Sequence, residues 1–539
     1  MRNIKPFLVA LLIFNYLSSK GQTAQWGHQI ITTSNLEAII YSIATDGENQ
    51  YVTGCFAGNI GGPGPIVTST GKEDIFLMKI DKKGQRNWVK SGGGSLAIAD
   101  VGRCVVYDKQ GYLYVTGSVS GTSNFDNSKS DGRGLKDIFL AKYDTTGKIL
   151  WVKNFGGAGD DEGAALDLDS EGNIILVGYY SNKTANFGSF SVKSFGGKDI
   201  FISKLTSEGE VIWVRRAGNA MIDDQAFSVK VDPDDNILVV GGAGVSYFEG
   251  QYNSDEIGFS PLGQDDAFLA KYDKDGIPVF VNRYGGRSSD KAFRVGLDNE
   301  GNIYVGGTFK DTVTFYNEVL GTIGSIDEIF VLKTDPEGKT LWAKSAGGSK
   351  HDYLKDMFVT ENGDVFICGY LSSLTGSFMG VNFKINGTFD AYVSKISSNG
   401  NLKWFKKMKG SNWAMATALS FNQSKDVFTG FGYSSSASVD VVKLAQTSNG
   451  LALLKIQDYD VITSNVNEQV EYSISYSPEF NSIINPDGAE LKILMYDILG
   501  RKIFEKDFTS ARQIELPVVN ELSIVNVKSG TQERVFKIF

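Results

Sequence analysis

Short runs in which apolar and polar residues alternate cover most of the chain, and they predict β-strands. Residues 103–108, 113–118, 137–144 and 149–154 form one group of four such runs, each bounded by glycine or aspartate turns. A period of two residues places apolar side chains on one face of a strand and polar side chains on the other. Each group therefore predicts four short antiparallel strands.

The group of four runs recurs with a period of about 62 residues. One marker is an acidic residue, a spacer, an aromatic residue, two further residues and a lysine, and its copies are 74–79, 137–142, 199–204, 266–271, 328–333 and 390–395, with a degenerate seventh that ends at 441–443. A second marker is a glycine that ends an apolar strand, at positions 54, 117, 178, 241, 307, 369 and 430. Seven units of four strands predict an all-β fold, a seven-bladed β-propeller, with a stack of solenoid repeats as the alternative.

A bulky ring follows an Asp-x-x-Gly-type turn in the fourth strand of the units. These rings are Trp88, Trp151, Trp213, Phe280, Trp342 and Trp404. We predict that they fill the space between neighbouring blades, because burial of one large ring contributes roughly 1.5 to 3 kcal/mol or more. Trp26 begins one further copy of the fourth strand, and residues 451–456 form another. With the six strands that carry the rings, these make eight fourth strands, one too many for seven blades. A ring must cover both of its edges, so we expect one copy to complete the last blade and the other to be a cap or linker.

The amino terminus predicts export. Arg2 and Lys5 precede an apolar stretch, 7–17, and a small-x-small site ends at Gly21, so residues 1–21 read as a signal peptide. That stretch is shorter than the roughly 20 residues that span a membrane, and we expect no transmembrane segment. Three scattered cysteines predict no disulfide framework, and we expect Cys55, Cys104 and Cys368 to be small buried apolar residues.

Composition and charge exclude two function classes. Gly at 62 of 539 residues, with 12% aromatics, argues against a mostly helical enzyme. A formal net charge of −9 argues against a nucleic-acid partner or an anionic membrane surface.

The repeated motifs resemble those of the seven-bladed β-propeller (SBBP) repeat family. The resemblance rests on Asp-Ile-Phe-Leu-x-Lys, Trp-Val-Lys, Gly-Gly, Asp-x-x-Gly-Asn and Tyr-Val-x-Gly in fixed order, and it covers residues 24–456. It implies a secreted or surface propeller, residues 22–456, with no transferable catalytic motif. Residues 142–151 also resemble the tryptophan-docking repeat of pyrroloquinoline-quinone dehydrogenases, but the unit is longer and vicinal cysteines are missing, so we expect no cofactor.

The tail, residues 457–539, has no 62-residue period. The run 491–504 reads as a strand, a glycine turn and a strand, and 522–527 and 535–539 add two more. Together they resemble the C-terminal sorting domain of type IX (Por) secretion, a small β-sandwich. The resemblance implies export of a Bacteroidota-type protein by the type IX machinery to the cell surface or the medium.

One aspartate recurs before the first strand of five units. These residues are Asp100, Asp161, Asp224, Asp290 and Asp352, with Trp413 in the seventh unit. They could form an acidic collar that binds cations or sugar hydroxyls. The favoured interpretation is that each accepts hydrogen bonds from its glycine loop, a need that every unit shares. The Asp-rich turns lack a long oxygen-ligand loop, and two histidines, His28 and His351, are too few for zinc, so we predict no metal site.

These observations predict a monomeric, non-enzymatic binding or adhesion propeller outside the cell, whose partner is a surface glycan or protein. No nucleophile elbow or phosphate loop occurs in the sequence, so we predict no catalytic residue. The alternative is a polysaccharide-active propeller, a glycosidase or lyase with carboxylates that converge at one mouth of the ring. Departures from the template, such as Trp413, residues 247–252 and Tyr179-Tyr180, are the better candidates for a unique function.

Overall fold

The computed structural model divides the chain into two compact units, 1–459 and 460–539, and each is described by itself. The predicted signal peptide, 1–21, lies outside the described residues. Every described element is a β-strand, and no helix able to cross a membrane occurs among the described residues. The structure describes residues 22–32, 38–61, 66–181, 184–220, 222–244, 246–250, 256–315, 318–322, 326–385, 387–422, 424, 426–439, 442–458, 475–477, 482–484, 491–497, 502–509, 513–515, 523–529 and 532–538.

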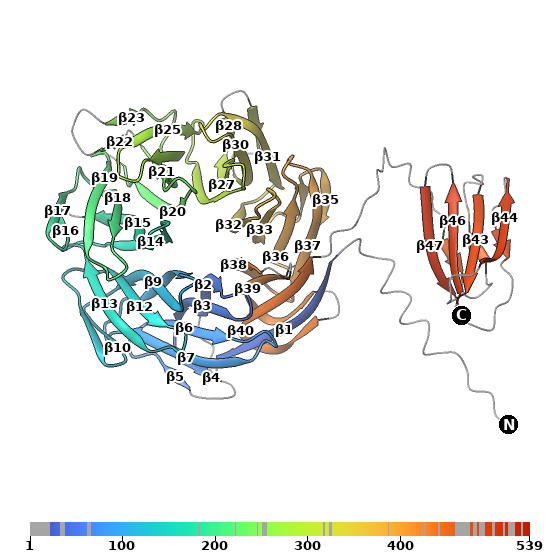
Figure 1. The fold of residues 1–539 in the computed structure, drawn as a ribbon, viewed down its shortest axis with the longest axis horizontal. Coiled ribbons are helices and arrows are strands. Elements are labelled where there is room, and N and C mark those ends of the chain that lie inside the picture. The colour runs from blue at the N-terminus through green and yellow to red at the C-terminus, as the bar shows by residue number, and fades with distance from the viewer. Residues whose placement is uncertain are drawn as a thin grey trace. The chain divides into compact units, whose positions relative to one another are not determined.

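The first unit is a ring of seven antiparallel blades (Figure 1). Blade one contains β2 (Ala38–Thr45), β3 (Gln50–Phe56), β6 (Asp74–Ile80) and β7 (Arg86–Gly93). Blade two contains β8 (Val101–Tyr107), β9 (Tyr112–Val119), β12 (Asp137–Asp144) and β13 (Ile149–Phe155). Blade three contains β14 (Glu162–Leu168), β15 (Ile174–Ser181), β18 (Lys198–Leu205) and β19 (Val211–Gly218). Blade four contains β20 (Gln225–Val231), β21 (Ile237–Ala243), β24 (Asp266–Tyr272) and β25 (Pro278–Tyr284).

The remaining blades follow the same order. Blade five contains β26 (Lys291–Leu297), β27 (Ile303–Lys310), β30 (Asp327–Thr334) and β31 (Thr340–Gly348). Blade six contains β32 (Asp352–Val359), β33 (Val365–Leu371), β36 (Asp390–Ile396) and β37 (Leu402–Gly410). Blade seven contains β38 (Ala414–Phe421), β39 (Asp426–Val439), β40 (Val442–Asp458) and β1 (Gln22–Thr32). The first strand of each blade contacts the first strand of the next, and β38 contacts β2, so the predicted all-β, seven-bladed propeller is confirmed.

The last blade closes the ring with strands from both ends of the unit. β40 lies between β39 and β1, with Lys455 opposite Phe428 on one side and Trp26 on the other. Residues 451–456 are therefore a third strand, and the seventh copy of the lysine marker ends at Lys455 instead of at 443. The expected leftover cap or linker does not exist, because the blade uses both segments and thereby covers both edges of the ring.

A hairpin between the second and third strands of each blade reaches the outer strand of the preceding blade, which the sequence pattern did not predict. β10 (Thr122–Phe125) pairs with β7, β22 (Ser246–Phe248) with β19, and β34 (Thr375–Phe378) with β31. β4 (Asn59–Gly61) pairs with β1, and the end of β39 pairs with β37. The partner strands in the hairpins are β11 (Ser128–Asp131), β23 (Ile257–Phe259), β35 (Val381–Lys384) and β5 (Val67–Thr68).

Blades three and five attach their hairpins more weakly. β16 (Thr184–Phe187) and β17 (Phe190–Lys193) reach blade two through the bridge between Asn186 and Gly156. β28 (Thr312–Phe315) and β29 (Glu318–Gly321) reach blade four through Thr314 and Gly285. The blades are thus linked around the outside of the ring by backbone hydrogen bonds as well as by packed side chains.

The second unit contains two antiparallel sheets. One is β41 (Ser475–Ser477), β42 (Ser482–Ile484) and β45 (Gln513–Glu515); the other has the order β44 (Lys502–Phe508), β43 (Leu491–Asp497), β46 (Ser523–Ser529) and β47 (Gln532–Ile538). Leu491, Ile493 and Met495 on the central β43 are buried. Packing of the two sheets as a sandwich, and a role in sorting, stay predictions.

Candidate functional site

The five recurring aspartates lie between blades. Each has at most 1% of its surface exposed, and each accepts hydrogen bonds from loop residues. Asp161 Oδ2 accepts from the N–H of Gly157 at 2.7 Å, and Asp161 Oδ1 accepts from the N–H of Ser181 at 2.8 Å. The corresponding donors are Gly94 and Ser120 for Asp100, Asn219 and Gly244 for Asp224, Gly286 and Lys310 for Asp290, and Ser372 and Ser373 for Asp352. Ligand binding by these residues stays a prediction. Their geometry shows that each carboxylate holds the loops around it by hydrogen bonds.

A second buried carboxylate, from the third strand of the preceding blade, lies near three of them: Asp74 near Asp100, Asp137 near Asp161 and Asp266 near Asp290. A Cβ on Gly156 would lie 2.5 Å from Asp161 Oδ2 and 3.1 Å from Asp137 Oδ1. Burial raises the pKa of Asp161 to about 6, and the charge of Asp137 adds to the rise. Burial, with a smaller effect of Asp266, raises the pKa of Asp290 to about 7. Two ionised carboxylates at one buried interface are costly, since burial and a like charge both disfavour ionisation.

Trp413 does not take the place of the aspartate in the seventh unit. The N–H of Ala414 donates to Phe389 O at 3.0 Å, as the N–H of Asp161 donates to Lys136 O at 3.1 Å. Ala414 is therefore the equivalent residue, and Trp413 is the residue before it. The sequence pattern indicated Trp413 because it counted from the strand-ending glycine. In blade seven Gly430 lies opposite Ala418, after the bulge, whereas in blade two Gly117 lies opposite Gly102, before it.

The blade rings lie against the Asp-x-x-Gly-type turn of the next blade. The indole N–H of Trp88 donates to Thr145 O at 3.2 Å, and that of Trp342 donates to Ser398 O at 3.0 Å. A Cβ on Gly147, which has a φ of +86°, would lie 3.0 Å from the Trp88 ring. Trp151, Trp213, Phe280 and Trp342 contact Gly209, Gly276, Gly338 and Gly400 in the same way.

The marker lysine also ties one blade to the next, a role that the sequence pattern did not reveal. Lys204 Nζ lies 2.9 Å from Asp169 in the first turn of its own blade and 3.4 Å from Lys274 O in the next blade. Blade two keeps the contact with the next blade but pairs its lysine with a carboxylate of that blade, not with one of its own first turn. Lys142 Nζ lies 2.7 Å from Glu208 and 3.1 Å from Ser207 O in blade three.

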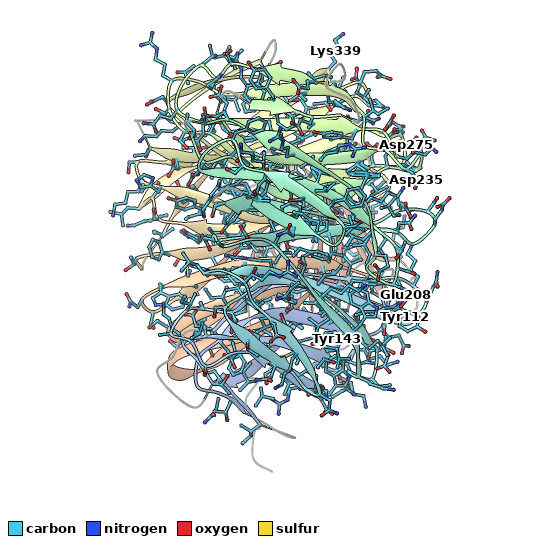
Figure 2. All side chains as sticks on the ribbon, turned by 90° about the vertical axis from the view of Figure 1, so that its left-hand side faces the viewer. Tyr112, Tyr143, Glu208, Asp235, Asp275 and Lys339 are labelled. Atoms are coloured by element: carbon cyan, nitrogen blue, oxygen red, sulfur yellow. The ribbon has the colours of Figure 1, made fainter. Side chains whose placement is uncertain are left out.

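This departure lies at a cavity of about 800 Å³ where the turns between first and second strands meet, which we call the turn mouth. Half-buried apolar side chains line it, together with Lys142, Glu208 and the 36%-exposed Tyr112. Figure 2 shows Tyr112 and Glu208 on the same side of the ring as Asp235 and Asp275, two further turn residues. The apolar residues include Val106, Tyr107, Leu168, Val231, Phe358 and Phe421. A cavity of this size with a few polar groups suits a small molecule or a peptide side chain.

Two ion pairs lie at the turn mouth. Lys230 lies 2.8 Å from Asp167, and Lys142 lies 2.7 Å from Glu208. Hydrogen bonding to Lys142 lowers the pKa of Glu208; in return Glu208 raises the pKa of Lys142 against the opposing effect of burial. Both pKa values move away from neutrality, whereas a general acid or base needs a pKa near the working pH.

The fold defines a seven-bladed propeller built from sequence repeats. No family model matches the chain. It is 21% identical over 443 residues to an uncharacterized WD repeat-containing protein L264 of Acanthamoeba polyphaga mimivirus, a match that covers 66% of this chain and 31% of the relative. It is 22% identical over 403 residues to the regulatory protein FlaEY of Caulobacter vibrioides, covering 68% and 41%. The chain thus spans less than half the length of these relatives.

Solved structures with similarity include the extracellular domain of a putative one component system, BT4673, from B. thetaiotaomicron, at 10% identity and a TM-score of 0.17 over 94% of this chain and 86% of that one. The same domain, described for a putative hybrid two component system, matches at 9% identity and a TM-score of 0.17, over 96% and 88%.

Proposed function

We propose that this chain is a non-enzymatic binding propeller that acts outside the cell and holds its ligand at the turn mouth. The cavity of about 800 Å³ carries the proposal, because it is the place where blade two departs from the shared lysine arrangement. A feature that every unit repeats serves the scaffold, whereas a feature of one unit is available for a ligand. Tyr112 would supply a ring face, and Glu208 with Lys142 would supply hydrogen bonds.

Binding at the turn mouth is tested with the mature chain on arrays of surface glycans and surface proteins. Y112A and E208Q should each weaken binding of the captured ligand about tenfold, which corresponds to about 1.4 kcal/mol. Y247A is the matched control, because Tyr247 is 51% exposed and does not line the cavity. Equal binding by all three variants would remove the turn mouth from the proposal.

The route to the cell exterior rests on the two ends of the sequence. Residues 1–21 have the charge and apolar pattern of a signal peptide, and 457–539 resemble a type IX sorting domain. In a host with this machinery, a chain that ends at residue 459 should stay in the periplasm while the full chain reaches the surface or the medium. Fractionation followed by immunoblotting measures this, and an extracellular truncated chain would contradict the proposed route.

A further inference from the structure

A group of rings from blade six lies at the end of β32 that is away from the turn mouth. His351 and Tyr353 flank Asp352 at the start of β32, whose other end, Phe358, lines the turn mouth. Tyr353 and Tyr370 have centroids 5.0 Å apart, and Tyr370 and Phe389 have centroids 5.3 Å apart. We call these four residues, His351, Tyr353, Tyr370 and Phe389, the ring cluster.

One carboxylate holds two of these rings in place. Asp327 Oδ2 lies 2.8 Å from His351 Nδ1 and accepts a hydrogen bond from the Tyr353 hydroxyl at 3.0 Å. The two rings are nearly parallel, at 17°, with centroids 6.3 Å apart, too far for full overlap and thus displaced from each other. The His351 side chain is 51% exposed. A platform fixed before binding loses little conformational freedom when a ligand arrives.

A cation lies beside the platform. Lys355 Nζ is 5.3 Å from the centroid of Tyr353 and 5.5 Å from that of Tyr370. Among the described residues, no carboxylate lies within ion-pair distance of Lys355, whereas Arg294 lies 2.6 Å from Asp356 and Arg103 lies 2.9 Å from Glu162. Burial lowers the pKa of Lys355, and the charges of Arg294 and Arg103 lower it further. An anion at this point would offset an unbalanced positive charge.

The ring cluster is specific to one unit. The residues that flank the recurring aspartate differ in the other blades: Ala99 and Val101, Asp160 and Glu162, Asp223 and Gln225, Ser289 and Lys291. Blade six alone places a ring on both sides. The scaffold has no need of this arrangement, since four other blades close without it.

We propose that the ring cluster binds an acidic sugar unit, a pyranose ring that bears a carboxylate, with the sugar against His351 and Tyr353 and its carboxylate toward Lys355. Aromatic faces pack against the C–H groups of a sugar, and a lysine ammonium pairs with its carboxylate. The site is separate from the turn mouth, so each proposal stands or fails without the other.

Oligogalacturonate and its fully methyl-esterified form test the proposal, because they share the sugar ring and differ in charge. The mature chain should bind the acid at least tenfold more tightly than the ester in calorimetric titrations, and added salt should reduce the difference. K355M should abolish the preference for the acid, and H351A should weaken binding of both forms. Y247A is the matched control and should bind oligogalacturonate as the natural chain does, because Tyr247 is 51% exposed and belongs to neither the turn mouth nor the ring cluster.

His351 supplies a direct signal, because the chain has only two histidines. Its imidazole C–H resonances in NMR should shift during titration with oligogalacturonate and should be missing in H351A. Unchanged thermal unfolding establishes that each variant is folded. Equal affinity for acid and ester, an acid preference that survives in K355M, or no binding of oligogalacturonate at millimolar concentration would each overturn the proposal.

Discussion

Replacing Asp137, Asp199 and Asp266 together by asparagine should stabilise the propeller at pH 8 and change it little at pH 5. Each side chain is buried at a blade interface, and each has an Oδ1 without a hydrogen-bond partner. The other oxygen accepts from the backbone, as Asp137 Oδ2 does from Arg133 N–H at 2.6 Å. Asparagine can keep that acceptor and place its amide where the unpaired oxygen lies, which removes a buried negative charge.

The direction with pH follows from the raised pKa values. The folded-state pKa is about 6 for Asp161 and about 7 for Asp290, against an ordinary value of 3.8. The folded state therefore binds these protons more tightly than the unfolded chain does. The contribution of these two carboxyls to the free energy of unfolding is therefore fully present below pH 3.8, and it is lost as the pH rises through 6 to 7. At pH 5 the carboxyls of Asp161 and Asp290 are already mostly protonated, so the substitutions beside them have little repulsion left to remove.

The size of the effect can be estimated from one pair. A rise of about two pKa units for Asp161 corresponds to about 3 kcal/mol, of which Asp137 supplies the smaller part because burial is the largest cause. We expect about 1 kcal/mol per replaced residue at pH 8, and about 3 kcal/mol for three well-separated sites. For a unit of this size, that corresponds to a rise in Tm of about 3 °C.

Differential scanning calorimetry at pH 5 and pH 8 measures this. The matched control is D390N, because Ala414 stands where the partner aspartate would be, while Asp390 lies 3.7 Å from Lys407 much as Asp266 lies 3.7 Å from Arg283. The control should be destabilised at pH 8, since Lys407 loses an opposite charge. If the triple variant is less stable than the natural chain at pH 8, or gains equally at both pH values, the account of the paired carboxylates is wrong.

Three further results are expected. G147A should cost at least about 1 kcal/mol in thermal unfolding, because the residue has a φ of +86° and its Cβ would press on Trp88, whereas G172A, with a positive φ but open space, should cost less. Deletion of residues 22–32 should expose the edge of β40 and produce aggregates in size-exclusion chromatography; a monomer that unfolds normally would contradict the closure. K395M should destabilise the ring by about 3 kcal/mol in urea unfolding, because Asp364 and Asp458 both lose the lysine that they share, although Asp364 keeps Lys403 at 3.1 Å.

The repeated pattern by itself determined the number of blades and their strands. Each unit carries the same alternation and the same turns, and these local features depend on residues close together in the chain. The tryptophan column and the first six lysines could also be predicted from the sequence, since a regular structure favours the same residue type at each repeat. The seventh lysine, Lys455, could not, because residues 451–456 were expected to be a fourth strand. The partners of the lysine could not be predicted from the sequence, because they lie on a different strand and on a different blade.

Only the tertiary structure decided how the ring closes and which side-chain contacts are specific to single blades. Strand β1 joins β40 across more than 400 residues of chain, and register across such a separation depends on the whole ring. The same holds for the register shift that moves Trp413 out of the aspartate column. The Asp327 carboxylate meets His351 and Tyr353, and Lys142 meets Glu208, only because neighbouring blades pack side by side. Such contacts depend on three-dimensional proximity between units, which no periodicity within a unit records.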